Sequence, residues 1–295
     1  SFSPSWRWLG EDENCVWYRS VRLIRQTSPG RWGGALTRVR EKLIELTNSR
    51  VSIPTPRPRF HANIELDRQL QSVDWLTETG VKIAPMINVP NVPIHVLRFL
   101  SLYEFLHQNN DYEYVVATDV KDVYFQKDPF EYLNGHKLVI ASEGLKYKDE
   151  PWGNQNLYQA YGPYVYEKFK ENEIFNVGTF GGQAEYVKDM FFHIFTNAIN
   201  RPIPICDQAV FNVLINTQPF KDIVYRTVDW ACEAGTVADP SKIDEFAPNL
   251  LCNQPIVENN IIKYGILHKP FEIVHQYDRV PEWKKFVMEK YNQQN

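Results

Sequence analysis

Apolar and polar positions along the chain predict strands and helices in alternation. The segment 94–106 is predicted to form a helix, with Val96, Leu97, Leu100 and Phe105 as its apolar residues. The apolar run Tyr114–Ala117 then predicts a buried strand. The same reasoning predicts strands over 81–86, 137–141, 174–180, 261–267 and 272–275, and helices over 64–76, 184–199, 207–215 and 281–291. This alternation predicts an α/β fold with a mixed, mostly parallel sheet flanked by helices.

The first fifty residues differ from the rest of the chain. They are rich in Trp and Arg, and a proline-rich break follows them over 51–60. We therefore predict an N-terminal arm or helical extension over 1–50 and one α/β domain over 51–295. A short strand at Val51–Ile53 would open that domain.

Two acidic residues follow the predicted strand Tyr114–Ala117 directly. Asp119 and Asp122 lie three positions apart, so a turn would bring both side chains to one side. A central strand of an open α/β sheet delivers its carboxyl end to the ligand crevice. Two carboxylates there suit Mn²⁺ or Mg²⁺, which share their remaining positions with a substrate phosphate. The alternative for an isolated pair is a solvated turn.

Composition narrows the class of protein. The 32 basic and 36 acidic residues give a net charge of −4, so we expect no nucleic-acid partner. The four cysteines form no Cys-x-x-Cys pair, which predicts mostly free thiols. No apolar stretch approaches 18 residues, and no Asn-x-Ser/Thr acceptor occurs. These features favour a cytoplasmic protein without a membrane span, although a lumenal location stays open if an anchor preceded Ser1.

Two segments place polar residues beside the acidic strand end. Arg98 lies on the predicted helix that precedes it and can form paired hydrogen bonds with a diphosphate; the alternative is a surface arginine. Asn176 and Gly178 lie in a glycine-rich extended segment, 175–182. Glycine permits close backbone approach and Asn can bind a hydroxyl group, whereas the alternative is a turn or bulge.

Two later segments add acid, amide and imidazole groups. Asp207 and Gln208 begin the predicted helix 207–215, where Asp207 either caps the helix or faces the crevice. His268 and His275 each follow an apolar run. A neutral imidazole at a strand end can complete a metal site, and the alternative is a structural histidine. We favour His275, because the polar residues 276–279 after it can support a ligand.

Taken in order, these segments resemble the metal-dependent, nucleotide-sugar glycosyltransferases of the GT-A fold. The match rests on Thr-Asp-Val-Lys-Asp-Val-Tyr-Phe at 118–125, Phe-Asn-Val-Gly at 175–178, Asp-Gln-Ala-Val-Phe-Asn at 207–212 and a C-terminal histidine, and it spans roughly residues 51–280. The second and third of these segments are similar to those of the glycogenin and bacterial galactosyltransferase group. Separately, residues 6–26 resemble the C-terminal tail of bacterial tetratricopeptide-linked glycosyltransferases.

The resemblance implies transfer of a sugar from a nucleoside diphosphate, UDP favoured and GDP open, to an acceptor hydroxyl of a glycan or other molecule. It implies Mn²⁺ or Mg²⁺ at Asp119, Asp122 and His275, with His268 as the other candidate. Asp207 is the candidate catalytic carboxylate, as a base or as a stabilising group. Donor-binding residues would be Arg98, Thr118, Asp119, Asn176, Gly178, Gln208 and Arg279, with Lys269 as a further cation. The alternatives are a non-catalytic carbohydrate-binding module, for which the aromatic stretch 147–166 suits sugar stacking, and a metal-dependent phosphohydrolase.

Overall fold

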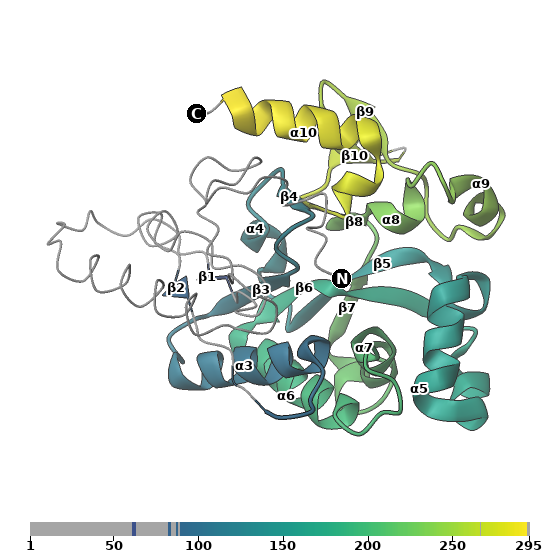
Figure 1. Ribbon diagram of the computed structural model, residues 1–295. Helices are drawn as coiled ribbons and strands as arrows, with labels where there is room; N and C mark the ends of the chain where they lie inside the picture. The colour runs from purple at the N-terminus through teal and green to yellow at the C-terminus, as the bar shows by residue number, and fades with distance from the viewer. Residues whose placement is uncertain (1–60, 63–81, 84–86, 88, 266, 294–295) are drawn as a thin grey trace, which may run out of the picture. The chain divides into compact units, whose positions relative to one another are not determined.

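The computed structural model describes residues 61–62, 82–83, 87, 89–265 and 267–293 (Figure 1). The chain divides into two units, Ser1–Asn88 and Val89–Asn295. In the first unit, β1 (His61–Ala62) pairs in parallel with β2 (Lys82–Ile83). β2 falls inside the predicted strand 81–86. The predicted arm, the boundary at residue 50, the strand Val51–Ile53 and the helix 64–76 lie outside the described residues and stay predictions.

The main sheet of the second unit has the strand order β3 (Tyr114–Thr118), β6 (Glu173–Gln183), β5 (Leu138–Lys146), β7 (Val224–Thr227). β6 pairs antiparallel with both β3 and β5, whereas β5 and β7 are parallel. Three strands therefore share a direction, but the inverted β6 lies between two of them. The fold is mixed α/β as predicted, and the main sheet mixes parallel and antiparallel strands because β6 runs against both of its neighbours.

Helix α5 (Pro151–Phe169) connects β5 to the inverted β6. It lies beyond the end of β5 in Figure 1, and a non-helical Gly162 (φ 76°) kinks it before Pro163. After this helix the chain returns along β5 as the antiparallel strand β6. Helix–strand alternation alone does not distinguish this connection from a crossover to a parallel strand.

One face of the main sheet is covered by α3 (Ile94–Gln108), α6 (Ala184–Ala198) and α7 (Asp207–Leu214), as Figure 1 shows. The period of two in β5 explains how both faces are buried. Leu138 and Ile140 join the core beneath these helices, while Val139 and Ala141 pack on the opposite face against Trp230. The predicted helices 94–106, 184–199 and 207–215 are confirmed to within two residues at each end.

A second, three-stranded sheet has the order β4 (Val123–Phe125), β12 (Ile273–His275), β8 (Ala231–Glu233). β12 runs antiparallel to β4 and parallel to β8. Trp283 and Val287 of α10 (Pro281–Gln293) share a hydrophobic core with Val274 of this sheet. The end of β12 thus lies beside the start of β4, directly after the predicted acidic turn.

The remaining elements complete the second unit. A small antiparallel sheet has the order β11 (Lys269–Pro270), β10 (Ile261–Tyr264), β9 (Ile256–Glu258). The short helices are α4 (Phe130–Leu133), α8 (Ala234–Val237) and α9 (Ile243–Phe246), with 3₁₀ turns at Tyr147–Asp149, Phe220–Asp222, Ala247–Asn249 and Tyr277–Arg279.

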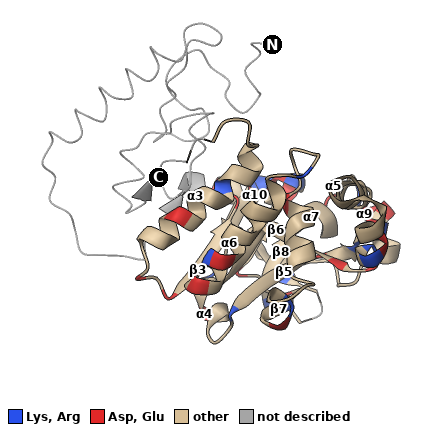
Figure 2. Cartoon of the chain, turned by 90° about the horizontal axis from the view of Figure 1, so that it is seen from below, with Lys and Arg blue, Asp and Glu red and all other residues tan. Residues whose placement is uncertain are grey.

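Three general features of the described residues bear on the expectations from composition. Cys206, Cys232 and Cys252 are free thiols, as predicted. Basic and acidic residues are interspersed over several elements in the view of Figure 2. Across the described residues, every helix is too short or too polar to cross a membrane.

Candidate metal centre and its surroundings

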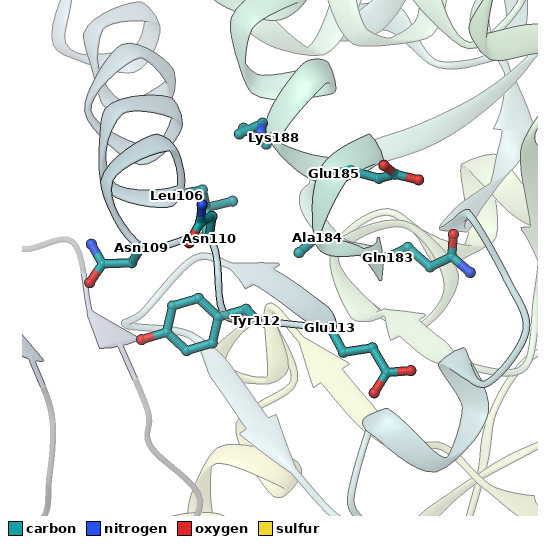
Figure 3. Close-up of a pocket in the computed structure, with 9 residues that line it drawn as sticks. All are labelled: Leu106, Asn109, Asn110, Tyr112, Glu113, Gln183, Ala184, Glu185 and Lys188. Atoms are coloured by element: carbon teal, nitrogen blue, oxygen red, sulfur yellow. The ribbon is translucent and has the colours of Figure 1, made fainter.

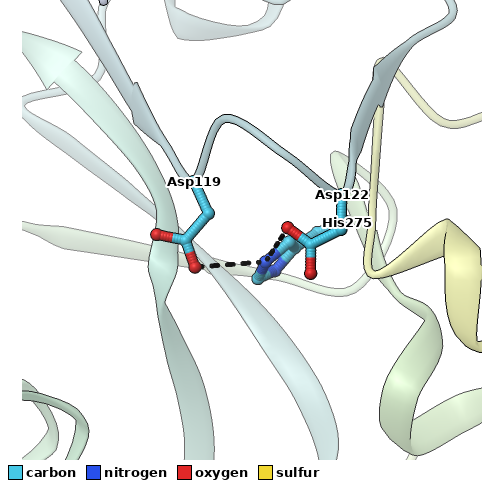
Figure 4. A group of neighbouring side chains, drawn as sticks. All are labelled: Asp119, Asp122 and His275. Atoms are coloured by element: carbon cyan, nitrogen blue, oxygen red, sulfur yellow. Dashed lines mark ion pairs between the residues drawn. The ribbon is translucent and has the colours of Figure 1, made fainter. Parts of the chain in front are cut away.

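Two sheets bring Asp119, Asp122 and His275 together (Figure 4). Asp119 follows β3 directly, and its backbone N–H donates to the carbonyl of Gly178 at 2.9 Å. Asp122 immediately precedes β4, and His275 ends β12 opposite Val123. His275 Nε2 lies 3.5 Å from Asp119 Oδ2 and 3.8 Å from Asp122 Oδ1. The ligand atoms of the three side chains all lie within 4.8 Å of one another, so this group can hold a metal ion.

Two further observations fit a cation at this position. His275 Nε2 is buried and has no hydrogen-bond partner, which is costly unless another group satisfies it. Gly178 is packed so closely that an added Cβ would lie 2.8 Å from both Asp119 Oδ2 and His275 Cε1. The donor set of two carboxylate oxygens and one imidazole nitrogen suits Mn²⁺ or Mg²⁺.

Glu233 fixes the orientation of the histidine ring. This residue ends β8 beside β12, and its Oε2 lies 2.6 Å from His275 Nδ1, with both side chains almost fully buried. Because Nδ1 is engaged by Glu233, Nε2 points to the two aspartates. Burial would lower the pKa of His275, but the carboxylates of Glu233, Asp119 and Asp122 raise it well above its ordinary value. Without a metal, the ring therefore carries a proton, which a cation would displace.

The two aspartates have different electrostatic surroundings. Burial would raise the pKa of Asp119, but His275 and the Arg98 guanidinium outweigh it and hold the pKa below its usual range. Burial raises the pKa of Asp122; His275 opposes this effect and Asp119 adds to it. Asp119 is thus the carboxylate held most firmly in the ionised form.

Arg98 links the metal cluster to Asp207. From α3, its Nη1 donates to Asp119 Oδ1 at 2.6 Å and its Nη2 donates to Asp207 Oδ2 at 2.9 Å. Asp119 therefore uses one oxygen for Arg98 and turns the other to His275. Asp207 is the first residue of α7 and is almost fully buried, while Cys206 occupies the N-cap position. The interpretation of Asp207 as a helix N-cap is wrong, and so is that of Arg98 as a simple surface residue.

A network of amides lies next to the cluster, where β6 leaves its ladder with β5. Ile140 pairs with Phe180 and Ser142 with Phe175, so one residue of β5 faces four of β6, 176–179. Such bulges redirect side chains and often accompany binding sites. Side-chain amides replace the missing ladder partners: Gln208 Oε1 accepts from Val177 N and Asn176 Oδ1 accepts from Gly178 N, both at 2.7 Å.

Glu143 joins the two amides on their other side. Its Oε1 accepts from Asn176 Nδ2 at 2.7 Å and from Gln208 Nε2 at 2.5 Å. Burial, with Glu233 and Glu150 nearby, raises the pKa of Glu143 to about 8. One turn along α7, Asn212 accepts from the backbone N–H of Phe175 at 2.9 Å and donates to its carbonyl at 2.8 Å, which holds the start of the bulge.

Two other predicted residues, His268 and Lys269, are paired with acidic residues outside this cluster. His268 lies in an exposed turn, with Nδ1 2.7 Å from Glu258 Oε1. Lys269 forms an ion pair with Asp229 at 2.8 Å and lies over the ring of Tyr132. Arg279 is exposed and Thr118 is half-buried at the end of β3, so their roles in donor binding stay predictions.

A surface cavity of about 320 Å³ lies at the opposite end of β3 and β6 (Figure 3). There Tyr114 pairs with Gln183, whereas the metal cluster lies beyond the pairing of Thr118 with Thr179. The cavity is lined by Leu106, Asn109, Asn110, Tyr112, Glu113, Gln183, Ala184, Glu185 and Lys188. It shares no residue with the predicted site.

Two buried carboxylates were missed by the sequence reasoning, Glu143 and Glu233. Each had a signal of the kind that revealed Asp119, because each follows a short apolar run: Leu-Val-Ile-Ala-Ser before Glu143 and Trp-Ala-Cys before Glu233. The second run is too short to predict a strand by periodicity.

Comparison with models of known protein families gave no match, and comparison with curated proteins gave none either.

Proposed function

We propose that this protein is a metal-dependent glycosyltransferase that moves a sugar from a nucleoside-diphosphate donor to an acceptor hydroxyl. The proposal is supported by the ordered sequence segments and by one structural observation above all. Asp119, Asp122 and His275 come from distant parts of the chain and converge with a buried, unsatisfied imidazole nitrogen between the two carboxylates.

The residues around the cluster fit the chemistry of diphosphate departure. A bound Mn²⁺ or Mg²⁺ would supply positive charge to the leaving diphosphate. Arg98 would contribute a second cation there while keeping Asp119 and Asp207 in place. Asn176 and Gln208 would bind sugar hydroxyls with the amide N–H groups left over from the network. Asp207 would act on the reacting centre, as a base or by stabilising positive charge on the sugar.

A donor panel tests this function. The protein is mixed with Mn²⁺ and UDP-glucose, UDP-galactose, UDP-N-acetylglucosamine or GDP-mannose, and both donor cleavage and the rise in unfolding temperature are measured. We expect cleavage of one donor, removed by EDTA and by Asp119→Asn or Asp122→Asn. Glu258→Gln, at the exposed pair with His268, is the matched control for loss of a carboxylate and should behave as wild type.

Other results would redirect the proposal. Metal-dependent binding of the sugar without any nucleotide would favour a carbohydrate-binding module. Release of inorganic phosphate from the donors would favour a phosphohydrolase. Donor cleavage that survives both EDTA and the two Asp→Asn substitutions would refute the metal-dependent mechanism.

A further inference from the structure

Glu143 is a buried acidic residue that does not belong to the metal cluster. It is a carboxyl group with 8% of its surface exposed, next to Asn176 at 8% and Gln208 at 6%. Buried carboxyl groups are rare unless a partner or a function holds them. Here a single oxygen, Oε1, accepts from both amides.

The contacts of Glu143 determine which way each amide points. The O and N ends of Asn and Gln are nearly the same size, so only the hydrogen bonds fix their orientation. Asn176 presents its oxygen to Gly178 N and its nitrogen to Glu143, and Gln208 presents its oxygen to Val177 N and its nitrogen to Glu143. A flipped amide would place N–H against N–H on one side and oxygen against oxygen on the other.

This arrangement leaves a defined set of free groups. Each amide nitrogen carries two hydrogens, of which one goes to Glu143 and one remains. Glu143 Oε2 has no hydrogen-bond partner among the described residues, and it is not one of the fully buried orphan atoms found there. Asn176 Oδ1 also lies 2.9 Å from the Cβ position that Gly178 lacks, which is itself 2.8 Å from Asp119 Oδ2. The amide network therefore borders the metal cluster at Gly178.

We propose that Glu143 is the positioning residue of a hydroxyl-binding site: it locks Asn176 and Gln208 in one orientation, and together with their free N–H groups it binds neighbouring hydroxyls of the donor sugar. This inference rests on the proposed function and narrows its substrate to sugars with free vicinal hydroxyls. The raised pKa of Glu143, about 8, leaves Oε2 protonated near neutral pH and able to donate to a hydroxyl oxygen.

The experiment separates the sugar from the nucleotide. Mn²⁺-dependent affinities for UDP and for the UDP-sugar that wild type cleaves are measured by calorimetry, or for GDP and GDP-mannose if that donor is used. The variants are Glu143→Ala and Glu143→Gln. Glu272→Ala is the matched control, because Glu272 is only 6% exposed and its pKa is also raised by burial, but it lies directly before β12, outside the amide network.

We expect Glu143→Ala to weaken binding of the sugar nucleotide by about tenfold, the scale of one or two lost hydrogen bonds, while affinity for the free nucleotide changes little. Glu143→Gln keeps an acceptor oxygen and should recover part of the loss. A deoxy-sugar donor that lacks the bound hydroxyl should bind wild type and Glu143→Ala alike. Glu272→Ala should retain the wild-type difference between the two ligands.

Three other results would overturn the proposed role of Glu143. Equal weakening of nucleotide and sugar nucleotide in Glu143→Ala would mean a general structural role and would overturn the inference. A sugar-dependent affinity that survives Glu143→Ala would overturn it as well, with the proposed function intact. If wild type binds no nucleotide with Mn²⁺, the proposed function fails first and this inference fails with it.

Discussion

Glu233 offers the most direct test of the candidate metal centre. It forms a hydrogen bond with His275 and with neither of the two aspartates. Its Oε2 lies 2.6 Å from His275 Nδ1, and its side chain is fully buried. Two effects depend on it: the ring orientation that turns Nε2 to Asp119 and Asp122, and the electron density that the carboxylate lends to the ring. Carboxylates behind a metal-bound histidine typically contribute about 10–100-fold in metal affinity.

The two substitutions at this position separate these effects. Glu233→Gln keeps an oxygen that can accept from Nδ1 but removes the charge, so we expect Mn²⁺ affinity to fall by about tenfold, or about 1.4 kcal/mol. Glu233→Ala also frees the ring to rotate and opens a buried void, so the loss should approach about 100-fold. Calorimetric titration with Mn²⁺, in the presence of UDP, measures both.

The chain supplies its own control for this experiment. His268 and Glu258 form a pair with a similar Nδ1–Oε1 distance of 2.7 Å, but the side chains are 59% and 40% exposed. Glu258→Gln should leave Mn²⁺ affinity unchanged. Wild-type affinity in both Glu233 variants, with the fold intact by circular dichroism, would refute the claim that His275 is a ligand held by Glu233.

Three further predictions follow from other contacts. Gly178→Ala should abolish Mn²⁺ binding without unfolding the protein, because its Cβ would lie 2.8 Å from Asp119 Oδ2 and from His275 Cε1; calorimetry that shows normal binding would contradict the close packing. Asn212→Ala removes both side-chain bonds to the backbone of Phe175 and should lower the free energy of unfolding by about 2–4 kcal/mol, measured by urea denaturation; a loss below about 1 kcal/mol would mean that water replaces the amide. Glu143 has a pKa of about 8 instead of 4.5, so the folded state binds its proton more tightly and stability should fall as pH rises from about 4.5 to about 8. Glu143→Gln should remove that part of the pH dependence, and an unchanged slope in the variant would show that the carboxyl is not buried in its acid form.

The sequence predicted helices well where apolar residues recur at helical spacing over several turns. Helices α3, α6 and α7 each show apolar spacing over two or more turns, and each lies where it was predicted. The acidic end of β3 could be recognised in the sequence because Asp119 follows an apolar run. Helix α5 was read instead as an aromatic surface stretch, since Gly162 and Pro163 break its pattern.

The sequence did not predict the direction of each strand or which strands pair with one another. The pairing of β6 with β3, and of β12 with β4 and β8, depends on contacts between residues 42 to 152 positions apart, which local spacing does not encode. For the same reason Glu233 could not be connected to His275, 42 residues away, nor Glu143 to Gln208, 65 residues away. The structure brings His275, and not His268, to the two aspartates. The residue that holds its ring is Glu233, whereas the prediction gave that support to residues 276–279.

The position of His275 between the two sheets also bears on how firmly the sheets are held together. Asp119 follows β3 of the main sheet, whereas Asp122 precedes β4 and His275 ends β12 in the second sheet. A cation bound by all three would therefore cross-link the two sheets. The loop that it closes, from 119 to 275, contains most of the second unit, and long loops gain the most from closure. Metal loading would thus tie the two sheets together at one point, in addition to the strand pairs that hold β12 between β4 and β8.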